Sequence, residues 1–284
     1  MRSFFMILIL VFSINSFAQE QDIKQETEHI SKLFNDIVNA KTDAEKIKLN
    51  KQIISIFSEL LQNKETFEYS FLELKFVSKL VSEDGKIKIY TWNIPYENGE
   101  FEYFGFVQLR KASGIELIEL KDKSKKIKQA ENKILSANNW YGALYYKMIS
   151  NTYKGKTYYT LLAWDGNDNF TNKKIIEILI LKNQKLQFGS PIIKMQNNEL
   201  KKRLIFEYSE QAKMMLRYDE KIKMIVFDHL APEQKKFKGQ YMYYGPDLSQ
   251  DGLIFENGLW VLKENLDLRN PDNNKGKKPI KTSF

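Results

Sequence analysis

Three oxygen-bearing residues near the C-terminal end of the chain are spaced like the first ligands of a calcium loop. Asp247, Ser249 and Asp251 alternate, and Gly252 follows them. This alternation directs three oxygens to one centre, and the glycine permits the sharp bend that such a loop needs. The twelfth position is Gly258, where the loop needs a bidentate Glu. Asp and Gly are also common in tight turns, so a calcium site and a plain turn both stay open.

Asp165 begins a second segment with the same alternation, because Asn167 and Asn169 follow it at the same spacing. Phe170 stands where glycine should come next, and Ile176 occupies the twelfth position. The match therefore rests on the oxygen ligands alone. Calcium is the only cofactor that these two segments suggest, with Asp165 as a further candidate ligand.

Asp228 and His229 place an acid beside a base in a segment of strand-forming residues. Adjacent residues on a strand point to opposite faces of the sheet, so these two cannot pair with each other while the strand continues. Each needs a partner from elsewhere. Arg217 on the preceding predicted strand is one candidate, and an Asp–Arg or His–carboxylate contact across the sheet would result. We favour a structural contact near a strand end over catalysis by Asp228, His229 and Arg217.

Composition excludes several chemistries. The chain has no cysteine, which rules out a disulfide, a thiolate nucleophile and a thiolate metal site. Its two histidines are His29 and His229, so a zinc site built mainly from histidine is excluded. A Ser-His-Asp triad could rest only on His229.

The positive charge of the chain comes mainly from lysine. The formal net charge is +8, and five of the 44 basic residues are Arg. Phosphate recognition favours the planar fork of Arg, which grips two oxygens at once. The composition is more typical of a solvated surface, and we expect no nucleic acid as a partner.

The first 18 residues read as a cleavable signal peptide. One positive charge precedes the apolar run Phe4–Phe12, and Ser16 and Ala18 supply the small residues that signal peptidase reads. Nine apolar residues are too few to span a bilayer as a helix, which needs ~20. Cleavage would leave Gln19 first, and no cysteine follows to carry a lipid. We therefore expect a periplasmic or extracellular protein that is not a lipoprotein and has no transmembrane span in its mature chain.

Residues 19–66 are predicted to form a helical hairpin. Apolar residues recur at helical spacing on both sides of a break at residues 39–41. Thr42 and Glu45 are spaced as a capping box that begins the second helix. That helix has an apolar face too wide for one partner helix. It serves either to dock or dimerise or to pack on the chain's own β-rich part, and we favour the second.

Residues 67–268 are predicted to form a β-rich domain. From about Phe67 the apolar period changes to two, and Asn98-Gly99 is a strong hairpin signal. The lysine-rich run from Lys121 to Lys133 is predicted to be a solvated linker or a surface helix between two β segments rather than a docking patch, and a boundary within 121–140 stays open. Residues 269–284 read as a flexible basic tail. The fold class is therefore α+β, mainly antiparallel β, with a meander that forms a sandwich or a barrel.

A small β-propeller is the alternative fold. Ser82-x-Asp84-Gly85 and Ser249-x-Asp251-Gly252 repeat one turn motif at a distance of about four blade lengths of ~42 residues each. The intervening segments carry no clear copy of this motif. The sandwich or barrel therefore remains the favoured architecture.

The second half of the chain resembles a known family. The residues that carry the resemblance are Tyr145-Tyr146-Lys147, Leu162 to Asn167, Phe206 to Ser209, Leu216 to Asp219, Val226 to Pro232 and Tyr244 to Ser249. Between Trp140 and Asn270 they resemble uncharacterised exported proteins of Bacteroidetes-type bacteria. The resemblance implies an exported protein of the cell envelope. It implies no activity, so no functional residue is carried over from it.

Two functions follow as hypotheses. The favoured one is a non-enzymatic binding or structural module of the cell envelope, with a protein or a glycan as the partner. The alternative is a carboxylate- or metal-assisted hydrolase directed at glycans, built on Asp165, Asp228, His229 and Asp247. A glycosidase would need two carboxyl groups ~5–5.5 or ~6.5–9.5 Å apart across a cleft. Aromatic residues beside turns, at 139–142 and 241–247, suit a sugar cleft if exposed and a core if buried.

Overall fold

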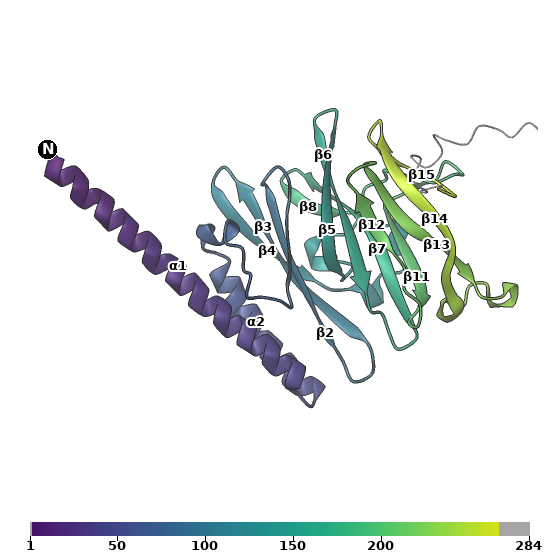
Figure 1. Cartoon of the computed structure of the whole chain (residues 1–284), viewed down its shortest axis with the longest axis horizontal. Helices are drawn as coiled ribbons and strands as arrows, with labels where there is room; N and C mark the ends of the chain where they lie inside the picture. Colours follow the sequence, from purple (N-terminus) through teal and green to yellow (C-terminus); the bar gives the residue numbers. More distant parts are fainter. Residues whose placement is uncertain (1, 267–284) are drawn as a thin grey trace, which may run out of the picture.

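A computed structural model describes the backbone of residues 2–266 and the side chains of residues 20–266. Two N-terminal helices are followed by antiparallel strands in three sheets, and Figure 1 shows these parts in a row from the helices to the C-terminal sheet. The fold is thus α+β and mainly antiparallel β, as the sequence predicts. The predicted tail at 269–284 lies outside the described residues.

The two helices are α1 (Arg2–Asn39) and α2 (Asp43–Leu60). The predicted capping box is present: the Thr42 hydroxyl accepts a hydrogen bond from the Glu45 backbone N–H, and the Glu45 carboxylate accepts one from the Thr42 backbone N–H. α1 runs without interruption across the predicted cleavage point, and the signal peptide stays a prediction. No helix in the described part of the chain is both long and apolar enough to cross a membrane.

The helices pack on the first sheet. Phe57 of α2 is fully buried against Trp92 and Phe106, two aromatic residues of that sheet. The Trp92 indole donates a hydrogen bond of 2.8 Å to the buried Asn50 side chain of α2. The wide apolar face of α2 therefore covers the chain's own β-rich part, which confirms the interpretation that we favour.

The first sheet is a four-stranded meander in the order β1-β2-β3-β4. Its strands are β1 (Ser78–Val81), β2 (Ile87–Pro95), β3 (Phe101–Lys111) and β4 (Gly114–Lys121), and the short helix η1 (Lys64–Phe67) precedes them. The predicted Asn98-Gly99 hairpin joins β2 to β3.

The predicted start of the β-rich part near Phe67 is wrong, because the first strand begins only at Ser78. The intervening segment is a coil that fills the space between the helices and the sheet. Phe71 and Leu74 are fully buried in it, whereas Leu72 is 76% exposed. Two lysine ammonium groups hold its carbonyl oxygens: Lys88 donates to that of Phe67 near its start, and Lys79 donates to those of Phe71 and Leu74.

The lysine-rich segment is a linker between the first and second sheets, as predicted. It contains the short helices η2 (Ser124–Lys126), η3 (Ala130–Asn132) and η4 (Ala137–Asn139), and its lysines are exposed. A buried arginine of the second sheet, Arg203, holds it by donating to the carbonyl oxygens of Ala130 and Lys133.

The second sheet has five strands in the order β11-β7-β6-β5, with β8 paired to β7. They are β5 (Leu144–Tyr153), β6 (Lys156–Asp165), β7 (Thr171–Lys182), β8 (Lys185–Phe188) and β11 (Arg203–Ser209). The third sheet has six strands in the order β10-β9-β15-β14-β13-β12. They are β9 (Ile193–Lys194), β10 (Leu200–Lys201), β12 (Leu216–Asp219), β13 (Met224–Pro232), β14 (Tyr244–Glu256) and β15 (Leu259–Lys263), with η5 (Lys235–Phe237) and η6 (Tyr241–Tyr243) between β13 and β14.

The propeller alternative does not describe this arrangement. The described residues form three sheets of four, five and six strands instead of about four equal blades. The repeated motif also has two different settings. Asp84-Gly85 forms the turn between β1 and β2, whereas Asp251-Gly252 lies inside β14.

Three apolar clusters hold the layers together. One joins the helices to the first sheet through residues such as Phe57 and Trp92. The second joins the first and second sheets, with Val107 facing the second sheet. The third joins the second and third sheets around Ile178 and Trp260. Each sheet therefore forms its core with its neighbours in the row of Figure 1.

Candidate functional site

The structure pairs the predicted His229 with a carboxylate of the neighbouring strand. Its Nδ1 lies 2.8 Å from Oδ2 of Asp251, whose other oxygen accepts a hydrogen bond from the Asn265 backbone N–H. The register shifts here, because His229 alone separates Asp228 from Leu230 in β13, whereas residues 247–249 lie between their partners Pro246 and Gln250 in β14. The hydrogen bond and the charge of Asp251 raise the pKa of His229 above its ordinary value.

Asp228 and Arg217 take partners other than His229 or each other. The Asp228 carboxylate accepts a hydrogen bond of 2.7 Å from the Met215 backbone N–H and one of 3.3 Å from the Gln250 amide. Arg217 donates to Asp219 of its own strand at 2.6 Å. The Asp228 contacts tie β13 to β14 and to the residue that precedes β12, whereas the Arg217 contact stays within β12, so both residues have structural roles.

The residues of the predicted calcium loop lie within strand β14. Asp247 accepts hydrogen bonds from the backbone N–H and the hydroxyl of Ser249, at 3.1 and 2.6 Å. Asp251 is turned toward His229 instead. Within residues 20–266, no group of three or more His, Cys, Asp or Glu side chains is placed to hold a metal ion.

Asp165 lies in a different sheet from these residues, at the end of β6. Its carboxylate is 5% exposed and accepts a hydrogen bond of 2.8 Å from the Asn167 backbone N–H. Burial raises the pKa of Asp165, and the charge of Lys173 partly opposes that change. Asn167 has a φ of 46°, in the left-handed region. Asp165 therefore shapes the turn between β6 and β7.

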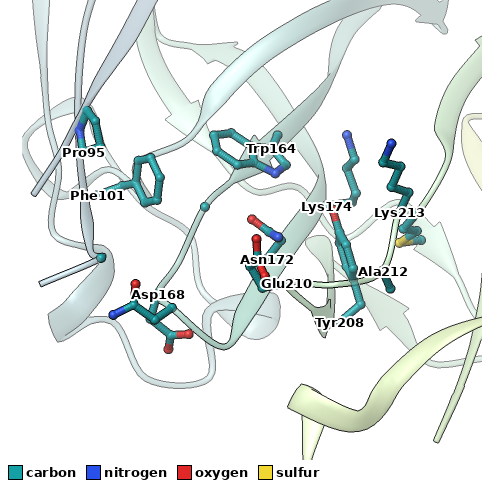
Figure 2. A pocket seen from close by; sticks show the side chains of 14 residues that line it. Pro95, Phe101, Trp164, Asp168, Asn172, Lys174, Tyr208, Glu210, Ala212 and Lys213 are labelled. Atoms are coloured by element: carbon teal, nitrogen blue, oxygen red, sulfur yellow. The ribbon is translucent and has the colours of Figure 1, made fainter. Parts of the chain in front are cut away.

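That turn forms one wall of a cleft of about 740 Å³. The opposite wall is the β2–β3 hairpin, and the end of β11 with the segment that follows closes the cleft (Figure 2). The cleft therefore gathers three segments that are distant in the sequence. They contribute aromatic, amide and charged side chains, which are Phe101, Trp164, Asp168, Asn169, Asn172, Lys174, Tyr208, Glu210 and Lys213.

Two aromatic rings form a corner of the cleft. Phe101 and Trp164 meet edge to face, with their ring centroids 5.5 Å apart. The Phe101 ring packs on the backbone of Gly166 so closely that a Cβ there would lie 2.4 Å from a ring carbon. On the other side of the turn, Asn169 donates to the Asn98 carbonyl oxygen at 2.9 Å. The two walls are thus fixed against each other before any ligand binds.

The charged groups of the cleft differ in their hydrogen bonding and in their exposure to solvent. Asp168 accepts hydrogen bonds from the backbone N–H groups of Phe170 and Thr171, at 2.8 and 2.9 Å, so its carboxylate stabilises the turn. Glu210 is exposed. Lys174 is half-buried, and burial lowers its pKa. Lys174 and Lys213 point their ammonium groups toward the same side in Figure 2.

The sequence identifies the turn of this cleft through Asp165 and Asn169, whose spacing suggests calcium ligands. It does not identify the aromatic corner. Trp164 directly precedes that turn and Phe101 closely follows the predicted Asn98-Gly99 turn, so an aromatic residue beside a turn is the signal that the sequence offers. Of the two aromatic clusters that the sequence suggests, Trp140 is fully buried in the core, while Tyr241 is 45% exposed.

Comparisons with protein-family models, with curated proteins and with solved structures find no match to this chain. The resemblance to exported bacterial proteins therefore stays a prediction.

Proposed function

We propose that this chain is a non-enzymatic binding module of the cell envelope that takes a glycan in the cleft beside Trp164. The observation that carries the proposal is the aromatic corner of Phe101 and Trp164, which lies at the edge of a preformed cleft. Sugar rings present flat C–H faces that pack on aromatic rings, and their hydroxyl groups need amide and charged partners around the edge.

The polar residues of the cleft support this ligand class. The Asn172 amide and the exposed carboxylate of Glu210 line the cleft with the aromatic rings (Figure 2). Both can exchange hydrogen bonds with hydroxyl groups. The volume of about 740 Å³ falls within the range of small-molecule sites.

The hydrolase alternative receives less support from this geometry. The four residues on which it rests, Asp165, Asp228, His229 and Asp247, are absent from the lining of the cleft. Asp168 does line it, but its Oδ1 accepts from two backbone N–H groups and its Oδ2 accepts from the Asn167 amide. Hydrolysis requires an acid and a base that are free to act, whereas binding does not, so we favour a binding role.

Export belongs to the proposal because the sequence features at residues 1–18 support it. Expression of the full chain in a Gram-negative host, followed by fractionation, tests this part. We expect a product outside the cytoplasm whose first residue is Gln19. A full-length product retained in the cytoplasm would contradict export.

Binding is tested on the chain from residue 19 with a panel of soluble oligosaccharides, using isothermal titration calorimetry. We expect at least one oligosaccharide to bind, and Trp164→Ala to weaken it at least tenfold through loss of ring stacking. Tyr241→Ala is the matched control, since Tyr241 is an exposed aromatic residue outside the cleft. Phe101→Leu serves as a second variant if Trp164→Ala fails to fold. Binding at unchanged affinity in whichever of these cleft variants folds would overturn the proposal.

A further inference from the structure

Lys174 occupies an unusual place for a charged residue. It lies on β7, which is flanked on both sides in the second sheet. Its direct neighbours across the sheet are Trp164 on β6 and Phe206 on β11. Residues directly opposite each other share one face of the sheet, so the lysine stands in an aromatic row.

The ammonium group of Lys174 has an aromatic neighbour but no acidic one. It lies 4.8 Å from the centre of the Tyr146 ring, which is a cation–π contact. Within residues 20–266, no carboxylate oxygen lies within 4.0 Å of it. The adjacent Lys173 points to the opposite face and differs in this respect, because it has Glu207 at 3.9 Å and the Asn167 amide oxygen as partners.

Burial makes this isolated charge costly. The pKa of Lys174 is lowered by loss of water around the ammonium group. A half-buried cation without a counter-charge gains more from an arriving anion than a fully solvated one does, because much of its desolvation has already occurred. This feature is the kind that marks ligand sites when it lies in a cleft.

Lys213 brings a second positive charge to the same cleft. It is exposed and likewise has no carboxylate oxygen within 4.0 Å in the described part of the chain. In Figure 2, Asp168 lies on the far side of the cleft from the two ammonium groups, and Glu210 and Asn172 overlap in the view between them. The charges are therefore divided, with the two lysines on one side.

We propose that the glycan of this cleft is acidic, and that a uronic acid unit packs its ring on Trp164 and places its carboxylate against Lys174 and Lys213. This inference rests on the proposed function and deepens it by naming the ligand class. A neutral sugar would leave the half-buried ammonium of Lys174 without a counter-charge. An amino sugar would add a further positive charge beside the two lysines.

The test uses two forms of one ligand that differ in charge alone. A galacturonic acid hexamer and its methyl-esterified form share a backbone, but the ester has no carboxylate. We expect the acid to bind at least tenfold more tightly than the ester, since an ion pair of this kind is stronger than a neutral hydrogen bond. The acid should also lose affinity as the salt concentration rises from 50 to 500 mM.

Variants of the lysines complete the test. Lys174→Met keeps the length of the side chain and removes the charge, so we expect it to weaken acid binding about tenfold and to weaken ester binding by a much smaller factor. Lys213→Gln should weaken acid binding by a smaller factor because this lysine is exposed. Lys182→Gln is the matched control, since Lys182 is an exposed lysine at the far end of the same strand.

The outcomes separate this inference from the function on which it rests. Equal binding of acid and ester, with no effect of Lys174→Met, would overturn acidic recognition and leave glycan binding intact. Binding of a neutral oligosaccharide alone, lost in Trp164→Ala, would do the same. No Trp164-dependent binding of any glycan would overturn the proposed function itself.

Discussion

Substitution of Arg203 by methionine tests how the second sheet holds the linker. The Arg203 side chain is completely buried and donates to Oε2 of Glu177 at 2.9 Å. It also donates to the carbonyl oxygens of Ala130, Lys133 and Phe188. Methionine has a similar length, so the variant keeps most of the packing and removes the charge and its hydrogen bonds.

The cost follows from what the substitution leaves behind. The Glu177 carboxylate is 1% exposed, and its Oε1 has no hydrogen-bond partner even with the arginine present. Breaking a buried ion pair by removing one partner costs about 3–5 kcal/mol. With a urea m-value of about 3 kcal/mol/M, a loss of 4 kcal/mol lowers the unfolding midpoint by about 1.3 M. We therefore expect Arg203→Met to lower the midpoint by about 1–2 M urea.

Urea denaturation followed by tryptophan fluorescence measures this loss, and two further variants identify its cause. Glu177→Gln in the Arg203→Met background should recover part of the stability, because an amide is less costly to bury than an unpaired carboxylate. Glu177→Leu in the same background should recover more. Hydrogen exchange should quicken at residues 130–133 in every Arg203 variant. A change below about 1 kcal/mol in Arg203→Met, with unchanged exchange at 130–133, would refute the reasoning.

Three further predictions concern other parts of the chain. Asp251 raises the pKa of His229, so the pairing of the two side chains stabilises the folded state. This stabilisation should be fully present below the ordinary histidine pKa of about 6.5, and it should be lost as the pH rises through the raised pKa of His229. The titration of the His229 ring protons by NMR should therefore move to lower pH in Asp251→Asn, and an unmoved titration would contradict the pairing. Asn50→Ala leaves the buried Trp92 indole N–H without a partner and should cost about 1–3 kcal/mol in thermal unfolding, whereas a loss below 0.5 kcal/mol would exclude that contact. In Gly166→Ala the new Cβ collides with the Phe101 ring, so the aromatic corner of the cleft must open. The loss in free energy of glycan binding, measured by calorimetry, should be at least as large as the loss in free energy of unfolding. Unchanged affinity would contradict a rigid cleft.

The sequence predicts those parts of the fold that depend on neighbouring residues. The Thr42–Glu45 capping box and the Asn98-Gly99 hairpin are local arrangements whose partners lie within a few residues, and both are present. The segment between Phe67 and Ser78 misled the prediction because alternating leucines occur there in a coil. The carbonyl oxygens at its start are held by Lys88, whose ammonium group reaches back to Phe67 and Tyr69, 21 and 19 residues earlier.

For the cleft too, the sequence predicts only arrangements whose residues are close together in the chain. The Asp165 turn can be recognised from its own residues, but the wall opposite it comes from Phe101, 63 residues earlier than Trp164. Nothing in the local pattern predicts that these two rings meet. Lys174 likewise looks like an ordinary lysine in the sequence, and its isolation becomes visible only when Trp164, Phe206 and Tyr146 surround it.

The parallel pairing of β15 with β9 constrains when this protein can complete its fold during synthesis. Trp260 in β15 lies opposite Ile193 in β9 and donates a hydrogen bond of 2.9 Å to Thr160, 100 residues earlier. The ribosome makes the helices and the first two sheets well before it makes this tryptophan. Until then the apolar face of the second sheet that Trp260 covers is exposed. This exposed face makes the nascent chain prone to aggregation. Chains that stop short of Trp260 should therefore be recognised as unfinished by chaperones and proteases, although most of their strands are already made.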